Sequence, residues 1–406
     1  MILSFVVLVT LWFKLIFSIS TAMKTDYDFD TLVDRRGTAS MKWDRYKDRD
    51  VLPLWVADMD FLSPPTVEAA LQERAAHGVF GYTGVPGALI DRVLSTLVEK
   101  YDWQVRAEWL VWLPGVVTGL NVACRAVGDD NDAVMTAVPV YPPFLTAPVY
   151  SKRRLVTVPL VQNSGRWEYD FDGLEKSITS DTKLFMFCHP HNPVGRVFDR
   201  KEIETLAGIC DRHDIIVCSD EIHCDLILDQ GITHIPTAVI DPDIAQRTIT
   251  LMAPSKTFNI PGLGCSFAVI PNPSIRHQFK KTMAGIVPSV NTMGFAAALA
   301  AYRNGWSWLT ALLSYLKDNR RCVTEAVAGM PGISMTHVEA TYLAWIDTRA
   351  TGLDEPARFF EAAGVGLSDG REFGGPGFVR LNFGCPRAIL EKALGRMQVA
   401  LDNLFH

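Results

Sequence analysis

The stretch APSKTFNIPGLG, residues 253–264, carries the strongest signal in this 406-residue sequence. The run TITLMA (248–253), which leads into it, is apolar and rich in β-branched residues, and it predicts a short buried strand. Pro261 and Gly262 predict a turn shortly afterwards. Although most lysines are solvated surface groups, Lys256 is therefore expected at the carboxyl end of a buried strand, where open α/β sheets bind ligands. A lysine removed from water there favours the neutral amine, which is suited to forming a Schiff base.

A carboxylate follows another apolar run upstream of the lysine. Asp220, in SDEIH (219–223), comes directly after IIVCS (215–219). At a strand end it is a metal ligand, a helix cap or the partner of a protonated pyridine nitrogen, and taken alone the cap is the commonest of these. Because Lys256 lies one helix–strand unit later, the pyridinium interpretation is favoured, since that cation makes the ring an electron sink.

A third polar segment, CHPHNPVGR (188–196), also follows a strand-like run. Asn-Pro and Val-Gly predict a turn, so the segment is at least a loop. In a functional interpretation, Asn192 donates its amide N–H to a ligand oxygen. His189 and His191 suggest a metal pair, but no carboxylate or cysteine stands at ligand spacing, and no metal site is predicted.

The wider pattern around these motifs predicts an α/β fold. From about Thr66 onward, helical segments alternate with short apolar runs of the kind that is buried on both faces of a parallel sheet. The clearest helical pattern is 200–213, and another helix is expected to open at Pro64-Pro65 and end at Gly78. The strand-like runs are 133–138, 183–188, 215–219, 248–253 and 265–270.

The alternation of helical and strand-like segments becomes less regular after about residue 305, which predicts a second, smaller domain. A helix at 306–328 and a final helix from Pro386 flank the strand-like runs 341–347 and 378–383, a pattern typical of an α+β unit. We therefore expect a large domain at 66–304, a small one at 305–406, and an N-terminal segment, 23–65, that joins the small domain.

Composition narrows the class of function. The formal net charge is −6 and no basic run occurs, so neither nucleic acid nor a membrane surface is an expected partner of the folded part. A small-molecule ligand is the expectation. The eight cysteines are scattered without CxxC pairs, which favours reduced, buried thiols in a cytoplasmic protein.

The first 22 residues differ from the rest, being almost wholly apolar with one charge at Lys14. They are a signal peptide without the usual positive start, a membrane anchor, or a translated segment upstream of a true start at Met23. Export or anchoring thus stays an alternative to the cytoplasmic assignment.

The lysine of SK, the aspartate of SDE, the asparagine of HNPVGR and the arginine of RLNFG, in this order and spacing, resemble the fold-type I pyridoxal-phosphate enzymes, the aspartate aminotransferase superfamily. More narrowly, LWVADMDF, FGYTG, SDEIHCDL and PSKTFNIPGL resemble the MalY/PatB branch of cystathionine β-lyases and C–S lyases. The resemblance covers about residues 24–405. It implies a mostly parallel seven-stranded sheet between helices in the large domain, a smaller α+β domain, and pyridoxal 5′-phosphate as the cofactor.

The resemblance also implies roles for single residues. Lys256 would hold the cofactor and later move the Cα proton of the substrate, and Asp220 would pair with the pyridine nitrogen. Asn192 would bind the ring hydroxyl and contact the substrate, and Tyr141 would stack on the ring unless it is a core aromatic. Arg380 would clamp the substrate carboxylate through two parallel hydrogen bonds, or else be an exposed strand-edge charge.

The remaining implied contacts concern the phosphate and the substrate. The backbone N–H groups of Gly115, Val116 and Val117 would cradle the phosphate at a helix N-terminus, with Ser255 adding a hydroxyl. Tyr82 would reach the phosphate of a neighbouring subunit, which requires a homodimer. Ala57, in LWVADMDF, would line the substrate position.

Three positions depart from the wider superfamily. His223 replaces a tyrosine and keeps a ring nitrogen that can bind the cofactor oxygen, Ala253 replaces a serine or threonine, and Gly264 replaces an arginine that would hold the phosphate. His223 and Gly264 fit the lyase branch better than typical aminotransferases.

The function implied by the resemblance is carbon–sulfur β-elimination from L-cystathionine or a related cysteine S-conjugate, giving a thiol such as homocysteine, pyruvate and ammonia. Two alternatives remain at this point. A class I/II aminotransferase shares every residue named above, and a non-catalytic sensor would keep the fold to bind the cofactor or a protein partner.

Overall fold

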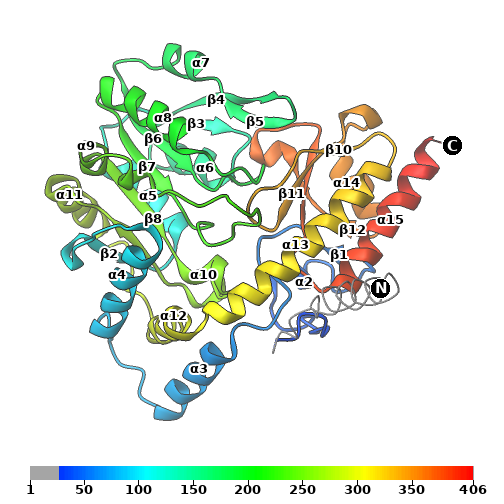
Figure 1. Ribbon diagram of the computed structural model, residues 1–406, viewed down its shortest axis with the longest axis horizontal. Coiled ribbons are helices and arrows are strands. Elements are labelled where there is room, and N and C mark those ends of the chain that lie inside the picture. The colour runs from blue at the N-terminus through cyan, green and yellow to red at the C-terminus, as the bar shows by residue number, and fades with distance from the viewer. Residues whose placement is uncertain (1–26, 406) are drawn as a thin grey trace, which may run out of the picture.

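The computed structural model describes residues 27–405 (Figure 1). The apolar leader 1–22 and Met23 lie outside this range, so the predictions made for them stay predictions. Between residues 27 and 405, no helix combines the length and the apolar character needed to cross a membrane.

A large mixed sheet forms the core of the fold, and its strand order is β2-β9-β8-β7-β6-β3-β4-β5. Strands β8, β7, β6, β3 and β4 run parallel, whereas β9 and β5 pair antiparallel with their neighbours. The predicted α/β class with a mostly parallel sheet is therefore confirmed. The strands are β2 (Leu110–Leu113), β3 (Ala133–Val138), β4 (Arg154–Asn163), β5 (Arg166–Tyr169), β6 (Thr182–Cys188), β7 (Ile216–Asp220), β8 (Thr248–Met252) and β9 (Ser266–Val269).

The strand count differs from the seven that the resemblance implied, because the described part of the sheet has eight. The additional edge strand is β5, which pairs with the end of β4 through a hairpin. Ser164 and Gly165 both have positive φ (49° and 78°), as a tight two-residue hairpin turn requires.

The central strands are apolar throughout because both faces of the sheet are covered. In β6, Leu184 and Met186 pack into one hydrophobic cluster together with α5 (Val116–Ala126), α6 (Pro143–Tyr150) and α11 (Pro273–Met283). The alternating residues Phe185 and Phe187 pack into a second cluster with α7 (Phe171–Lys176) and α8 (Arg200–Arg212). A period of two along the strand thus sends successive side chains into different layers. All eight cysteines are unpaired, and all except Cys322 are buried.

Helix ends follow the local signals closely. Helix α8 starts with a capping box between Asp199 and Glu202, and α3 ends at Gly78, which has a φ of 75°. The helices are α2 (Met41–Asp44), α3 (Pro65–His77), α4 (Gly87–Tyr101), α5 (Val116–Ala126), α6 (Pro143–Tyr150), α7 (Phe171–Lys176), α8 (Arg200–Arg212), α9 (Pro242–Gln246), α10 (Pro254–Thr257), α11 (Pro273–Met283), α12 (Thr292–Asn304), α13 (Trp306–Gly329), α14 (Pro356–Ala362) and α15 (Arg387–Phe405).

A second, antiparallel sheet occupies the C-terminal part, with the order β10-β11-β14-β13. Figure 1 shows α13 running diagonally toward this sheet, with α14 and α15 beyond it. Near the N-terminus, β1 (Leu52–Pro53) pairs in parallel with β12 (Val365–Gly366). The domain boundaries predicted at residues 65 and 304 stay predictions. The strands of the second sheet are β10 (Ser334–Met335), β11 (Leu343–Asp347), β13 (Ser368–Asp369) and β14 (Phe378–Asn382).

Candidate active site

Five strands that run in the same direction end at one edge of the large sheet, and each brings an expected residue there. Gly115 follows β2, Lys256 follows β8, Asp220 closes β7, Asn192 follows β6 and Tyr141 follows β3. These strands lie close together in the sheet, with only β9 between β2 and β8. The fold therefore gathers residues from five separate motifs at the edge where α/β sheets bind ligands.

Lys256 lies in α10, the single helical turn that begins two residues after β8 ends. Its Nζ donates a hydrogen bond to the carbonyl oxygen of Ala57 at 2.5 Å. Burial lowers the pKa of this lysine to about 8, although the carboxylates of Asp58 and Asp220 favour its charged form. The amine thus loses its proton at a lower pH than a surface lysine, which favours nucleophilic chemistry.

Asp220 is buried, and its Oδ1 accepts a hydrogen bond from the backbone N–H of Ile222 at 3.1 Å. The pKa of this carboxyl group is raised to about 7, chiefly by burial and also by the neighbouring Glu221, whereas the Ile222 N–H and Lys256 act in the opposite direction. A carboxyl group in this position gains when a cation is placed beside it. A protonated ring nitrogen meets that requirement.

Arg380 joins the two sheets, because it lies on β14 of the C-terminal sheet and donates to Asn192 of the large-sheet side. Its Nη1 is 3.0 Å from Oδ1 of Asn192, and its Nη2 is 2.8 Å from the carbonyl oxygen of Trp55. The guanidinium group also lies over the ring of Phe373, 4.6 Å from its centroid. Only 4% of Arg380 is exposed, which excludes the alternative of a strand-edge surface charge.

The charge of Arg380 is costly where it lies. Burial lowers the pKa of its guanidinium group to about 10. Its buried Nε has no hydrogen-bond partner among residues 27–405. An anionic ligand that accepts a hydrogen bond from this group would relieve both penalties.

Tyr141 and His223 lie near these charged groups. The backbone N–H of Tyr141 donates to the carbonyl of Asn192 at 3.1 Å, and burial raises the pKa of its phenol. His223 is buried, and burial lowers the pKa of its imidazole to about 3, with smaller contributions from Lys256 and Arg380. His223 is therefore neutral at physiological pH, and its Nδ1 has no partner in the described part of the chain.

The segment after β2 offers an anion site at the start of α5. Gly115 is the N-cap, and no side chain caps the first turn, which begins at Val116 and Val117. A Cβ atom added at Gly115 would meet nothing within 4 Å, so the space beside this N-terminus is open. Unpaired N–H groups at the start of an eleven-residue helix attract a phosphate. Ser255, partly exposed in α10, is the hydroxyl expected beside it.

Gly264 has a structural reason for not being the superfamily arginine. Its φ is +59°, and a Cβ atom there would lie 3.0 Å from the carbonyl oxygen of Pro114. A side chain at this position would strain the backbone and press on the loop that leads into α5. An anion at the helix N-terminus would therefore be held without that positive charge.

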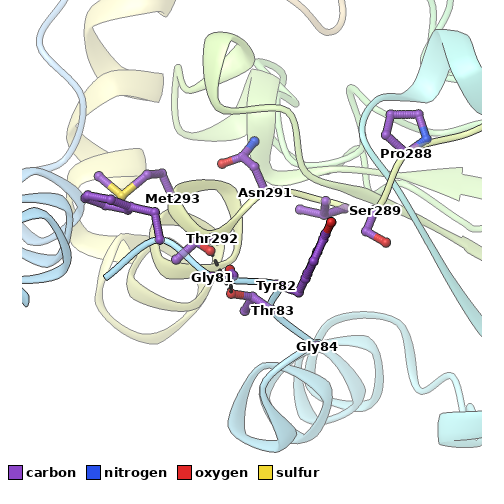
Figure 2. Close-up of a pocket in the computed structure, with 11 residues that line it drawn as sticks. Gly81, Tyr82, Thr83, Gly84, Pro288, Ser289, Asn291, Thr292 and Met293 are labelled. Atoms are coloured by element: carbon purple, nitrogen blue, oxygen red, sulfur yellow. Dashed lines mark hydrogen bonds between the residues drawn. The ribbon is translucent and has the colours of Figure 1, made fainter. Parts of the chain in front are cut away.

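Tyr82 lies apart from the other expected residues. It is fully exposed and borders a hollow of about 860 Å³ lined by residues 80–84 and 288–293, none of which belongs to the group above. Figure 2 shows the two loops side by side, with Thr83 hydrogen-bonded to Thr292 at 2.7 Å. The exposed neighbours Val79 and Phe80 add apolar surface around it.

Sequence reasoning missed a set of contacts made by the backbone of residues 55–59. Successive carbonyl groups of this segment accept hydrogen bonds from the side chains of Arg380, Asn382, Lys256, Tyr342 and Asn259. Backbone acceptors leave no residue-type signal. The two recognisable signals were the polar Asn382 inside the apolar run FVRLNF and the tyrosine at the start of TYLAWID.

The ring of His191 is held by the backbone. Both ring nitrogens of His191 lie within hydrogen-bond distance of backbone carbonyl oxygens, those of Cys188 and Pro139. Among residues 27–405, no group of three or more histidine, cysteine, aspartate or glutamate side chains is arranged to hold a metal ion.

Comparison with known proteins places this geometry in a family. The model for aminotransferases of class I and II matches residues 49–397. Cystathionine β-lyase PatB of Bacillus subtilis is 37% identical over 92% of this chain and 100% of its own length.

Two solved structures are similar to this chain in both fold and sequence. The crystal structure of OvoB superimposes with a TM-score of 0.91 at 48% identity, over 92% of this chain and 99% of that one. The structure of the PLP-bound C–S lyase from Staphylococcus hominis gives 0.88 at 35% identity, over 93% and 99%. The chain belongs to the class I and II aminotransferase family, in the branch that includes PatB.

Proposed function

We propose that this protein is a pyridoxal-phosphate-dependent carbon–sulfur β-lyase that acts on L-cystathionine or a related cysteine S-conjugate. The products would be a thiol, homocysteine in the case of cystathionine, together with pyruvate and ammonia. The proposal is supported by the names of PatB and of the C–S lyase with a similar structure. It is also supported by the chemistry of the residues at the sheet edge.

The residues present fit this cofactor. The uncapped start of α5 suits its phosphate, the buried carboxyl group of Asp220 suits its ring nitrogen, and the half-buried amine of Lys256 suits its carbonyl carbon. The buried Nδ1 of His223 lacks a partner among residues 27–405 and is available for a ligand. Tyr141 and Asn192 would complete the contacts to the ring and its hydroxyl.

One observation carries the proposal. Arg380 and Lys256 are both hydrogen-bonded to backbone carbonyls of the same segment, those of Trp55 and Ala57. Trp55 and Ala57 are only two positions apart in the chain, so the side chains of Arg380 and Lys256 converge on one short segment. A substrate whose carboxylate is held by Arg380 would therefore present its Cα–H within reach of the Lys256 amine.

The chain's residues would then divide the work. When bound, the cofactor supplies an electron sink for the charge left at Cα, and Asp220 would keep its ring nitrogen protonated. Arg380 would orient the substrate through its carboxylate, and Lys256 would take the proton from Cα. Loss of that proton weakens the bond between Cβ and sulfur, so that a thiolate departs and collects a proton.

The nearest alternative is an aminotransferase, because the family includes such enzymes and the same residues serve both reactions. The discriminating experiment is incubation of the cofactor-loaded protein with L-cystathionine in the absence of any keto acid. Equimolar release of pyruvate and free thiol would support the lyase. No release of either product, together with amino transfer once a keto acid is added, would refute it. A cofactor-loaded protein that does neither, with or without a keto acid, would instead fit the sensor alternative.

The quaternary structure belongs to the proposal as well. A homodimer would bury Tyr82, Phe80 and Val79, which are exposed in the single chain, and would bring Tyr82 to the phosphate of the other subunit. Light scattering of the holoenzyme would give twice the chain mass, and a Tyr82→Phe variant would bind the cofactor more weakly. The eight unpaired cysteines support a reducing, cytoplasmic location.

A further inference from the structure

Tyr342 lies at the centre of the site, beside the backbone of Ala57. Its side chain is buried, and its hydroxyl donates a hydrogen bond to the carbonyl oxygen of Ala57 at 2.9 Å. That oxygen is the one that accepts from Nζ of Lys256. The tyrosine and the lysine thus share a single acceptor.

The ring of Tyr342 makes a second contact within the site. It packs edge to face against His223, with the ring centroids 6.2 Å apart and an angle of 73° between the planes. The same residue therefore touches both the acceptor of the lysine amine and the neutral imidazole beside it.

The backbone that delivers Tyr342 is strained. Thr341 has a φ of +75°, which is rare for a β-branched residue and costs about 1–3 kcal/mol. It is held by a hydrogen bond from its N–H to the carbonyl of Leu226 and by one from the N–H of Leu343 to its hydroxyl. Strain of this kind persists when the surrounding structure requires a particular direction of the chain, and here it turns the next side chain toward Ala57.

We propose that Tyr342 is a positioning residue that controls how strongly the Ala57 carbonyl holds the amine of Lys256. Two donors on one carbonyl oxygen share its two lone pairs and its partial negative charge, so each is bound less tightly than it would be alone. Because the Tyr342 hydroxyl also donates to the Ala57 carbonyl, that carbonyl stabilises the protonated form of Lys256 less. The free amine is then available to take the Cα proton. This inference rests on the proposed function for its chemical consequence, but its effect on the lysine does not depend on the leaving group.

The test uses Tyr342→Phe in the full-length chain. In the cofactor-free protein, the pKa of Lys256 is measured from the pH dependence of its reductive methylation, quantified on its own peptide by mass spectrometry. Loss of the competing donor is expected to raise that pKa by about half a unit to one unit, equivalent to one modest hydrogen bond.

A second readout uses the cofactor-loaded protein and L-alanine, which has no leaving group. Exchange of its Cα hydrogen with solvent deuterium requires only that the lysine move a proton. At pH 7 the variant is expected to exchange about three- to tenfold more slowly, because less of its lysine is neutral. The difference should vanish at pH values above the raised pKa.

Tyr169→Phe is the matched control, since Tyr169 is also buried and its hydroxyl has no partner in the part of the chain described. An unchanged lysine pKa in Tyr342→Phe, an equal shift in the control, or a loss of exchange that is the same at every pH would each overturn the inference. If the shift occurs but no thioether yields pyruvate, the lyase proposal fails while the role of Tyr342 stands. If pyruvate is released but the pKa of Lys256 does not shift, the lyase proposal stands and the proposed role of Tyr342 fails.

Discussion

The large-sheet side of the site is built from side chains at the ends of strands. The C-terminal side is built from side chains that donate hydrogen bonds to the backbone carbonyls of residues 55–59. On the first side, Lys256 and Asp220 follow directly from β8 and β7. On the second side, Arg380 and Asn382 project from β14 and bind the carbonyls of Trp55, Val56 and Asp58. Under the proposed function, the first arrangement would provide the reactive groups, and the second would set where the substrate lies relative to them.

This difference predicts different consequences of mutation. A change on the large-sheet side should remove a chemical step and leave substrate binding, because each side chain there has its own task. A change on the C-terminal side should alter orientation, because several donors share one segment of backbone. Variants on both sides of the site test that division.

Lys256→Ala should reduce turnover by about a thousandfold or more, because Lys256 is the residue proposed to move the Cα proton. Cofactor absorption and pyruvate release measure the two functions of the lysine. Lys201→Ala, which removes an exposed lysine on α8, is the control and should behave as wild type. Substantial turnover in Lys256→Ala would mean that another residue is the base.

Arg380→Lys should lower kcat/KM for L-cystathionine by about ten- to a hundredfold, since an ammonium group cannot make two parallel hydrogen bonds to a carboxylate. An analogue of L-cystathionine that lacks the α-carboxylate should react equally slowly with the wild type and with Arg380→Lys. Arg349→Lys changes an arginine whose side chain is 61% exposed and serves as the control. A variant that lost turnover on both compounds to the same extent would contradict a role in carboxylate binding.

The same division explains how much was predictable from the sequence. The strand ends were predictable because apolar runs bounded by turn residues mark them, and β3 was predicted with its observed limits, 133–138. The contacts of residues 55–59 were not, because a backbone carbonyl is present in every residue. The strand predicted at 341–347 begins only at Leu343, because the positive φ of Thr341 depends on a distant contact with Leu226.

The hairpin that adds β5 was also missed, although Ser164 and Gly165 are ordinary turn residues. Its strands, RLVTVPLVQN and RWEY, contain polar residues and a proline, so they lack the continuous apolar pattern of the central strands. An edge strand is only half covered, and its sequence resembles that of a loop.

Asp220→Asn should make the cofactor-free protein more stable at alkaline pH. Because the folded state raises the pKa of this carboxyl group from 3.8 to about 7, its charge opposes folding. The free energy of unfolding of the wild type therefore falls as the pH rises from about 4 to 7 through this group. The variant should gain about 4 kcal/mol at pH 8, because raising a pKa from 3.8 to about 7 corresponds to that free energy, and little at pH 4.

Urea denaturation at both pH values measures this difference. Asp172→Asn, an exposed carboxylate in the first turn of α7, is the matched control and should leave the pH dependence of stability as it is in the wild type. Bound cofactor should abolish the gain of Asp220→Asn, since the ring nitrogen then compensates the carboxylate. A gain of equal size at pH 4 and pH 8 would show that ionisation is not its cause.

Gly264→Ala tests why the large-sheet side lacks an arginine at the phosphate position. The substitution should lower the free energy of unfolding by about 2 kcal/mol, through the positive φ and the contact with Pro114 together. Gly285 has a φ of +77° and open space around it, so Gly285→Ala isolates the backbone term and should cost about 1 kcal/mol. Only the change at Gly264 should also weaken cofactor binding, because Pro114 leads into the start of α5. Equal losses of stability, with cofactor affinity unchanged in both variants, would mean that the close approach to Pro114 does not shape the phosphate site.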